Sequence, residues 1–486
     1  MPDDSSNKIV TSLPPSQRAN LVGGHLPSFF RDRTAFLTRQ AALGDVTYLR
    51  MGPQPVFFLN HPDHIRDLFV VNADKFEKGR ALKRAKVLLG EGLLTSEREA
   101  HLRQRRMIQP AFHRARIAEY AVSMVEYADK MASDWQVGET RDIDKEMMHL
   151  TLQIVAKTLF SAEVEDDADE IGAAMTTMVE LFNFLLLPFS EWLEKLPLPH
   201  SIRFKRAKKK LDEVIYGIID ERRRTGEDKG DLLSMLLMAQ DETDGTAMTD
   251  EQVRDEALTL FLAGHETTAN ALTWTWFLLS QNPETEAKLH AELGSVFAKG
   301  GNLSGSEGVF SASDSSIDVK NTLPTGRVSA LRTPTIDDIP NLKFTEAVFA
   351  ESMRLYPPAW AIGRNVVAAH DFGGYTAKPG TLILTSPFVT HRDARFWEDP
   401  LEFRPERWET MSVKEAGNRN IYFPFGGGVR RCIGESFAWT EGILLIATIA
   451  RKWRLSLVPG QKIGLNPQIT LRPKFGMRMK VSNRSK

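Results

Sequence analysis

Cysteine is almost absent from this sequence. Among 486 residues there is a single one, Cys432. No intramolecular disulfide can form, so a disulfide scaffold is excluded, and so is a zinc site built from several cysteines. An excess of basic charge is also missing, because 62 Lys and Arg residues stand against 63 Asp and Glu residues. This balance argues against a protein that binds nucleic acid through bulk charge.

Targeting and membrane-spanning signals are lacking as well. Residues 1–20 contain no apolar stretch of the kind that signal peptides and anchors need. The most apolar stretch, Leu258–Leu279, carries His265, Glu266 and Asn270 in its middle. An ionised group there would cost about 3 kcal/mol or more in lipid, so a buried helix is the better interpretation. We therefore expect a soluble, cytoplasmic protein without a transmembrane anchor.

What is present is an ordinary globular composition, with 42% hydrophobic and 26% charged residues. This excludes a disordered or fibrous chain, and the length fits several domains or one large single-core enzyme. Helical periodicity dominates the chain, with short strand-like segments near both ends. The expected helices include Ile117–Gln136, Ile143–Phe160, Ile171–Leu187, Ile202–Glu221, Asn341–Leu355 and Ile443–Trp453. The expected strands lie at Asp45–Met51, Val56–Asn60, Tyr375–Ser386, Leu455–Val458 and Met477–Val481.

One predicted helix is unusually long. Thr249 and Gln252 have the spacing of a capping box, and Asn282-Pro283 is a stop signal. The roughly 33 residues between them would span about 50 Å as an α-helix. A helix of that length must cross the whole molecule, so its middle lies at the centre.

The segment around the single cysteine is the most informative. Three glycines precede Cys432, Gly434 follows it, and Arg430 and Arg431 flank it. Glycines let the backbone fold closely around the sulfur, and nearby cations favour the thiolate, which is the form that binds metals. The N-terminus of a following helix, Glu435–Arg451, would add positive potential.

Three other interpretations of this segment remain open on these residues alone. A lone cysteine is often an inert buried side chain. A Gly-rich turn with two arginines could hold a phosphate, although no Gly-Lys-Ser/Thr sequence follows. A nucleophilic cysteine would need a base, and no histidine is close in sequence, although a distant one could be adjacent in the fold.

The same segment resembles the signature of the cytochrome P-450 family, Phe-x-x-Gly-x-Arg-x-Cys-x-Gly. Phe425, Gly428, Arg430, Cys432 and Gly434 match it at every fixed position. The resemblance implies a haem b cofactor with Cys432 as the axial thiolate ligand of the iron. It also implies a mainly α fold with small β-sheets, formed by one large domain over residues 25–486 after an N-terminal extension, 1–24. A Gly/Ser-rich stretch, with 12 such residues among positions 300–329, is expected to be a flexible insertion spanning about 300–335.

A second motif lies in the middle of the long helix. Ala263-Gly264-His265-Glu266-Thr267-Thr268 resembles the oxygen-activation motif of the family. The resemblance implies that Thr267 holds a water or the bound dioxygen and that Glu266 connects it to bulk protons. Gly264 and Ala263 would leave room for the ligand. The structural alternative is a core helix whose threonine bonds its own backbone.

A third resemblance concerns an ion-pair cluster. Glu351 and Arg354 match the family's Glu-x-x-Arg pattern, and Arg407 lies in a later segment, Phe403–Trp408, that matches another family motif. The resemblance implies that these three residues form a buried structural cluster, in which one carboxylate is shared by two guanidinium groups.

Donors to the haem propionates are implied by the same resemblance. His101 and Arg105 lie four residues apart on a predicted helix, so they share one face. Arg364 and Arg430 complete the expected set of propionate-binding residues. His101 occupies a position where many relatives have tryptophan.

The implied activity is monooxygenation, in which one atom of O₂ enters a lipophilic substrate and the other becomes water. Electrons from NAD(P)H would arrive through a ferredoxin or flavodoxin-type donor, docked near Arg103, Arg106 and Arg431. Residues 182–189, Ile362 and residues 469–471 are expected to line an apolar channel for a fatty acid, terpene or steroid. Two alternatives remain: a haem-thiolate peroxygenase, isomerase or dehydratase, and a non-enzymatic haem sensor or carrier.

Overall fold

The computed structural model describes residues 13–162, 168–185, 196, 198–239, 245–298 and 331–484. Most of this part of the chain is helical. The α-helices are α1 Leu26–Arg31, α2 Arg33–Ala41, α3 Pro62–Arg66, α4 Arg80–Leu89, α5 Arg98–Ile108, α6 Arg114–Ser133, α7 Ile143–Phe160, α8 Ala168–Leu185, α10 Pro199–Thr225, α11 Leu232–Met238, α12 Asp250–Gln281, α13 Pro283–Phe297, α14 Lys343–Leu355, α15 Pro387–Thr390, α16 Arg407–Thr410, α17 Val413–Asn418 and α18 Glu435–Ala450. Short helical turns of other types include η1 Asp67–Val71, η4 Ile336–Asn341 and η5 Gly428–Arg430.

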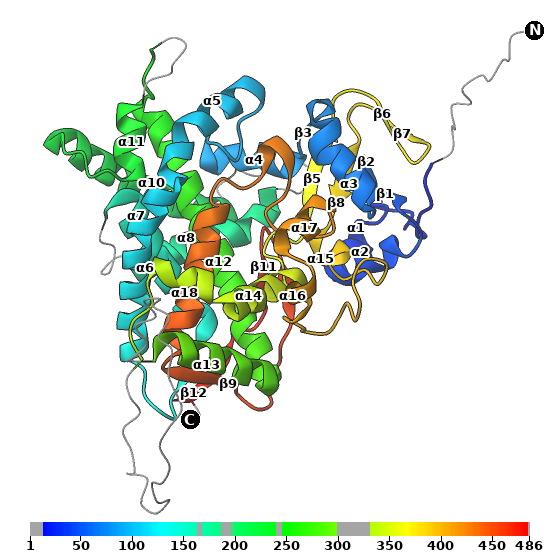
Figure 1. The fold of residues 1–486 in the computed structure, drawn as a ribbon. Coiled ribbons are helices and arrows are strands. Elements are labelled where there is room, and N and C mark those ends of the chain that lie inside the picture. Colours follow the sequence, from blue (N-terminus) through cyan, green and yellow to red (C-terminus); the bar gives the residue numbers. More distant parts are fainter. Residues whose placement is uncertain are drawn as a thin grey trace, which may run out of the picture.

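The strands are short and fall into separate sheets. They are β1 Val46–Met51, β2 Gln54–Leu59, β3 Phe76–Lys78, β4 Thr140–Asp142, β5 Ile362–Val366, β6 His370–Phe372, β7 Tyr375–Ala377, β8 Leu382–Thr385, β9 Trp453–Leu457, β10 Leu465–Pro467, β11 Leu471–Pro473 and β12 Arg478–Asn483. The largest sheet has the order β1-β2-β8-β5-β3 and lies to one side of the helices (Figure 1). Its β2 and β8 pair in parallel although more than 300 residues of chain separate them. The predicted fold class, mainly α with small sheets, is confirmed.

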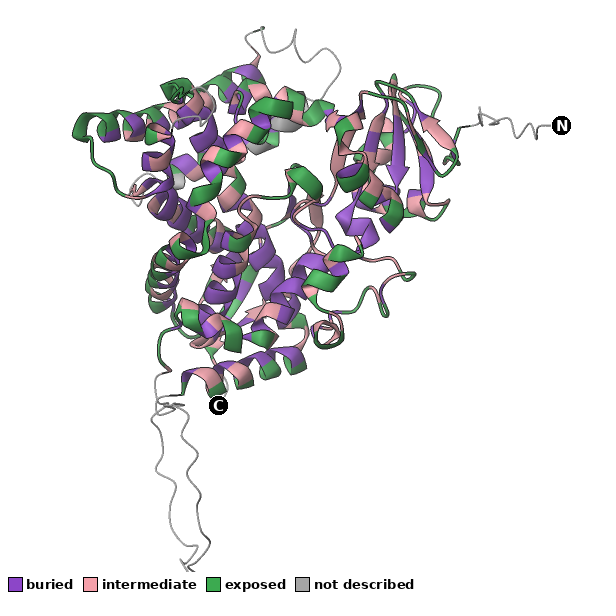
Figure 2. Cartoon of the chain, turned by 45° about the horizontal axis from the view of Figure 1, so that its top comes forward, coloured by how far each residue is buried: buried purple, intermediate pink, exposed green. Residues whose placement is uncertain are grey.

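The long helix α12 runs through the centre of the helical part. Its capping box between Thr249 and Gln252 is present, and the helix ends at Asn282 before Pro283, as predicted. Its 32 residues correspond to about 48 Å. It packs against α7, α10, α14 and α18, and most of its side chains are buried. Figure 2 shows this central region as largely buried, with exposed residues on the outer helices.

Most predicted helices are found close to their expected bounds, and Ile143–Phe160 is found at the predicted residues. The predicted helix Ile443–Trp453 is wrong at its end, because α18 stops at Ala450 and Trp453 begins β9. The Trp453 indole donates to the Ala132 carbonyl oxygen (2.6 Å), and the strand then pairs with β12. Tertiary pairing therefore ends the helix earlier than its apolar pattern suggests.

No helix in the described part of the chain is long and apolar enough to cross a membrane. The Gly/Ser-rich stretch of residues 300–329 lies outside the described residues. The predicted channel segment 182–189 also lies outside them, apart from the backbone of residues 182–185 at the end of α8.

Candidate active site

The loop that carries Cys432 is held in a tight conformation by its glycines. Gly428 has a positive φ of 64°, and a side-chain carbon there would lie 1.7 Å from the Phe69 carbonyl oxygen. The Cys432 N–H donates to the Phe425 carbonyl oxygen (3.0 Å), which closes the loop on itself. Any residue other than glycine at position 428 would collide with the η1 turn, so the loop and η1 must pack as observed.

The thiol of Cys432 lies inside the molecule and is nevertheless accessible. The residue is exposed, yet burial raises the pKa of its thiol to about 11, against a smaller lowering by a backbone hydrogen bond from Gly434. An exposed side chain in such a desolvated place faces an internal chamber. The expected lowering of the pKa by flanking arginines does not dominate, because Arg431 pairs with Glu435 (2.6 Å) and Arg430 with Glu97.

A second accessible position lies in the interior, in the middle of α12. Ala263 is exposed although its helix neighbours Glu266 and His265 are buried. The helix α18, which begins three residues after Cys432, packs against α12. Glu441 of α18 is a buried neighbour of the Thr268 side chain, and burial raises the pKa of Glu441 to about 8. The exposed thiol and the exposed turn of α12 therefore indicate a chamber between these two elements.

Gly264 also has a packing role, in addition to the one expected. A side-chain carbon there would lie 3.0 Å from a methyl group of Val155, on α7. Gly264 therefore allows α7 and α12 to approach closely; it is half-buried, and Ala263 beside it is exposed. The Thr267 hydroxyl donates to the Ala263 carbonyl oxygen (2.7 Å), so in this state the threonine bonds its own helix.

The Glu266 carboxylate is held on the side of β11. Its Oε1 accepts a hydrogen bond from Arg472 Nε (2.8 Å) and another from the Thr470 hydroxyl. Glu266 is buried, whereas the Arg472 side chain is 12% exposed, so this pair leads from the interior toward solvent. Arg472 was not identified from the sequence, since it lies in no motif. The neighbouring His265 is buried, and desolvation lowers its pKa to about 3.

A cluster of cations converges near the start of the cysteine loop. Lys78 of β3 and Arg364 of β5 are directly opposite in the antiparallel register, and their side chains therefore share one face of the sheet. Arg430 lies close by: its guanidinium and the Lys78 ammonium both donate to the Ser96 carbonyl oxygen. Sequence reasoning identified Arg364 and Arg430 but missed Lys78, because a lysine at the end of a three-residue strand carries no pattern.

This cluster is short of negative charge. Burial lowers the pKa of Arg364 to about 10 and that of Lys78 to about 7, and in both cases the positive charge of Arg430 adds to the lowering. The carboxylate within hydrogen-bond reach of the cluster, Glu97, is already paired with Arg430. Like charges directly opposite on a sheet are unfavourable. The arrangement therefore suits a ligand with more than one negative charge.

His101 and Arg105 lie one turn apart on α5, as expected. His101 is buried, and desolvation lowers its pKa to about 3, with further lowering from Lys78, Arg430, Arg105 and Arg364. The imidazole therefore lies within electrostatic reach of those four positive charges and is neutral. Arg105 also donates to the Arg431 carbonyl oxygen (2.7 Å), next to Cys432.

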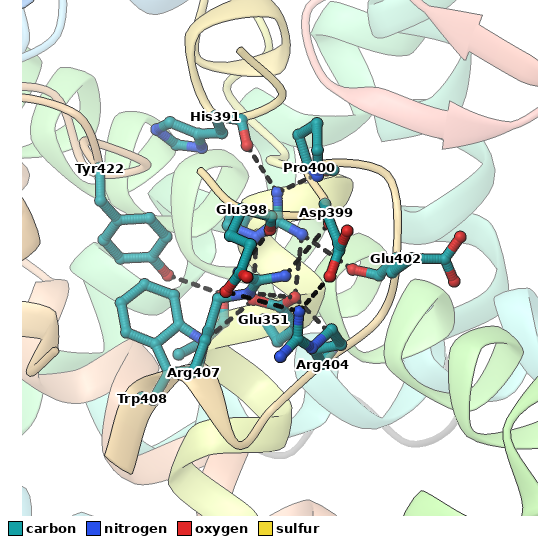
Figure 3. A network of polar contacts seen from close by, with 12 residues as sticks. Glu351, His391, Glu398, Asp399, Pro400, Glu402, Arg404, Arg407, Trp408 and Tyr422 are labelled. Atoms are coloured by element: carbon teal, nitrogen blue, oxygen red, sulfur yellow. Dashed lines mark hydrogen bonds and ion pairs between the residues drawn. The ribbon is translucent and has the colours of Figure 1, made fainter. Parts of the chain in front are cut away.

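The predicted Glu351, Arg354 and Arg407 come together in one network (Figure 3). Glu351 is fully buried and accepts hydrogen bonds from Arg354, Arg407, the Arg404 N–H and the Trp408 indole. The remaining donors of Arg354 reach the carbonyl oxygens of His391, Pro400 and Glu402. These hydrogen bonds join α14 to the segment that precedes the cysteine loop. They also give the buried charged groups hydrogen-bond partners.

The expected channel residues differ in their exposure. Ile469 is 39% exposed, and Ile362 is half-buried. Leu471 is fully buried in a cluster with Phe36 and Trp360, so it does not line an accessible channel. Thr470 is also buried and is engaged with Glu266.

Comparison with known proteins identifies the class. The family model described as "Cytochrome P450" matches residues 14–308 and 318–479. The chain therefore belongs to the cytochrome P450 family. The exposed thiol in an interior chamber and the anion-deficient cation cluster both fit the haem of that family, whose two propionates carry negative charge. The protein is a cytochrome P450 monooxygenase.

Several named relatives are similar over nearly their whole length. Cyclooctatin synthase of Streptomyces melanosporofaciens is 38% identical over 93% of this chain and 91% of its own. Cyclooctat-9-en-7-ol 5-monooxygenase of the same organism is 36% identical over 90% of this chain and 88% of its own. Pentalenene oxygenase of Streptomyces avermitilis is 33% identical over 90% of each chain.

Proposed function

We propose that this enzyme hydroxylates a terpenoid, either a hydrocarbon or a mono-alcohol, and that it uses haem b with Cys432 as the axial ligand. The observation that carries the proposal is the accessible thiol of Cys432 in the interior of the molecule. The names of two relatives give an unsaturated alcohol and pentalenene as their substrates. A terpene was among the lipophilic substrates expected from the sequence.

The chain offers a matching set of ligands for haem b. Cys432 would hold the iron, and the metal would deprotonate a thiol whose own pKa is about 11. Arg364, Arg430, Lys78 and His101 would bind the propionates, and this would neutralise the excess positive charge of their cluster. When bound, haem supplies the binding and reductive activation of O₂.

Proton delivery would depend on Thr267 and Glu266. The Thr267 hydroxyl lies one turn from the exposed Ala263, and it can turn from the Ala263 carbonyl oxygen to a water in the chamber. Glu266 would take protons from the Arg472 side and pass them toward this hydroxyl through water.

Replacement of Thr267 tests this role. In Thr267→Ala we expect product formed per NAD(P)H consumed to fall about tenfold or more, while NAD(P)H consumption continues, because one proton donor is lost. The measurement is product against NAD(P)H and hydrogen peroxide, with Thr273→Ala, another α12 threonine that bonds its own backbone, as the matched control. Coupling unchanged from the wild type would contradict the role and favour a haem-thiolate peroxygenase or isomerase.

Replacement of Lys78 tests the propionate cluster. We expect Lys78→Met to release haem to apomyoglobin about tenfold faster, because one propionate partner is lost at a cost of about 1.4 kcal/mol. The apoprotein should unfold within a few degrees of the wild type, because removal of a like charge opposite Arg364 offsets the lost hydrogen bonds to the Leu93 and Ser96 carbonyl oxygens. Lys86→Met, at a half-buried lysine on α4 paired with Glu91, should change neither value. Unchanged haem release in Lys78→Met would remove Lys78 from the cluster's function.

A ferredoxin or flavodoxin-type protein is the proposed electron donor. Its docking face would be the surface over the cysteine loop, where Arg106 and Val429 are exposed. Two expected contributors are already engaged: Arg103 donates to the Thr246 hydroxyl (2.6 Å) and Arg431 pairs with Glu435. Arg106→Glu should therefore weaken reduction by the donor, and more strongly at low ionic strength.

The substrate class is tested by titration of the haem protein with small molecules. Displacement of the iron-bound water changes the haem spectrum and reports binding directly. We expect polycyclic terpene hydrocarbons and their mono-alcohols to cause this change at micromolar concentrations, and fatty acids to cause none. A library in which only fatty acids or only steroids bind would overturn the terpenoid assignment but leave the haem-thiolate chemistry intact.

A further inference from the structure

A groove on the surface of the protein lies apart from the haem chamber. It runs between α2 with its following turn and the segment that follows α15, and these two helices are neighbours in Figure 1. Its volume is about 860 Å³, which is within the range of small-molecule sites. Neither Cys432, Ala263 nor any residue of the cation cluster lines it.

The groove carries an excess of positive charge. Three arginines line it, Arg39, Arg392 and Arg395, against a single carboxylate, Asp393. That carboxylate is occupied, because Arg395 donates to it through Nη2 (2.7 Å) and Nε, and Asn60 lies beside it. Arg395 also pairs with Asp45 (2.5 Å), whereas among the described residues no carboxylate forms an ion pair with Arg39 or Arg392.

Arg392 is unusual for a cation in this position. Its guanidinium stacks on the Phe388 ring at 3.7 Å and lies 5.1 Å from the Tyr356 ring. Burial lowers its pKa to about 9, and the positive charge of Arg354 adds to this lowering. Of its five N–H donors, the described contacts use one, which reaches the Phe388 carbonyl oxygen (3.2 Å). Arg392 is half-buried, and none of its nitrogens is a buried atom without a partner, so its unused donors are accessible and can pair with an anion in the groove.

The rest of the groove is largely apolar. Ala35, Ala42 and Pro400 lie along its walls, and Leu401 beside them is 70% exposed. A small inorganic anion would leave these walls uncovered. An apolar body attached to one anionic group would cover them and would also pair with the arginines.

We infer that this groove is a second ligand site, which binds a free amphipathic carboxylate of the fatty-acid type. The carboxylate pairs with the guanidinium groups of Arg392 and Arg39, and the apolar body lies along Ala35, Ala42 and Leu401.

The test uses the holoenzyme with an azole inhibitor filling the haem chamber, so that only other sites remain. Titration with cis-parinaric acid, a fluorescent fatty acid, should show saturable binding with one site per chain. Palmitate should displace the probe, whereas inorganic phosphate should not. Hexadecanol, which lacks the charge, should compete at least about tenfold more weakly.

Substitutions locate the site. Arg39→Glu should weaken binding of the probe about tenfold or more, and Arg392→Met should abolish saturable binding. Arg31→Glu, at an exposed arginine on α1 outside the groove, is the matched control and should bind as the wild type does. Arg39 is exposed, so Arg39→Glu decides the question even if Arg392→Met fails to fold. Absence of saturable binding, equal competition by hexadecanol, or wild-type affinity in Arg39→Glu would each overturn the inference.

Discussion

Replacement of Cys432 by serine should abolish monooxygenation, with product formation at least about a thousandfold below that of the wild type. The thiolate donates electron density that favours cleavage of the O–O bond, and a serine hydroxyl cannot take its place. In this protein burial raises the pKa of the thiol to about 11, and the smaller lowering by Gly434, Arg105 and Arg431 does not offset it. Without a bound metal the sulfur is therefore protonated at neutral pH.

Turnover of a terpenoid substrate with an excess of electron donor measures this effect. Ser436→Ala, at an exposed position in the first turn of α18, is the matched control and should retain wild-type turnover. Product formation by Cys432→Ser at a rate within tenfold of the control would mean that another residue holds the iron.

Replacement of Glu351 by glutamine should have the largest effect on stability. This carboxylate is fully buried and accepts from Arg354, Arg407, Arg404 and Trp408. Its neutralisation leaves two buried guanidinium groups without a counter-charge, which costs about 3–5 kcal/mol. That is a large part of the stability of a typical domain, so we expect a protein that is poorly folded and largely free of haem.

The comparison is with Glu346→Gln, at a half-buried glutamate in the first turn of the same helix. Denaturant unfolding and the ratio of haem to protein after purification give the two values. Wild-type stability and haem content in Glu351→Gln would show that the network of Figure 3 does not support the cysteine loop.

Features that depend on neighbouring residues could be predicted from the sequence. The capping box at Thr249 and the stop at Asn282 defined α12 almost to the residue, because caps and stops act within a few residues. The tight loop at Gly428 could be anticipated for a similar reason, since the fixed spacing of glycines and cysteine is typical of such a loop.

Features that depend on distant segments could not be predicted. Lys78 enters the cation cluster only because β3 pairs with β5, nearly 290 residues later in the chain. Arg472 reaches Glu266 because β11 packs beside α12. Gly264 faces Val155 because α7 also packs against α12. The thiol pKa is a related case, since the arginines that flank Cys432 are paired with Glu97 and Glu435, and only the fold reveals these partners.

The central claim is that the sulfur of Cys432 binds haem iron as a thiolate. The most direct test is the absorption spectrum of the purified holoprotein, reduced under carbon monoxide. We predict the red-shifted band typical of thiolate-ligated haem in the wild type, and its loss in Cys432→Ser. A wild-type spectrum typical of imidazole-ligated haem, or an unchanged band in Cys432→Ser, would contradict the claim.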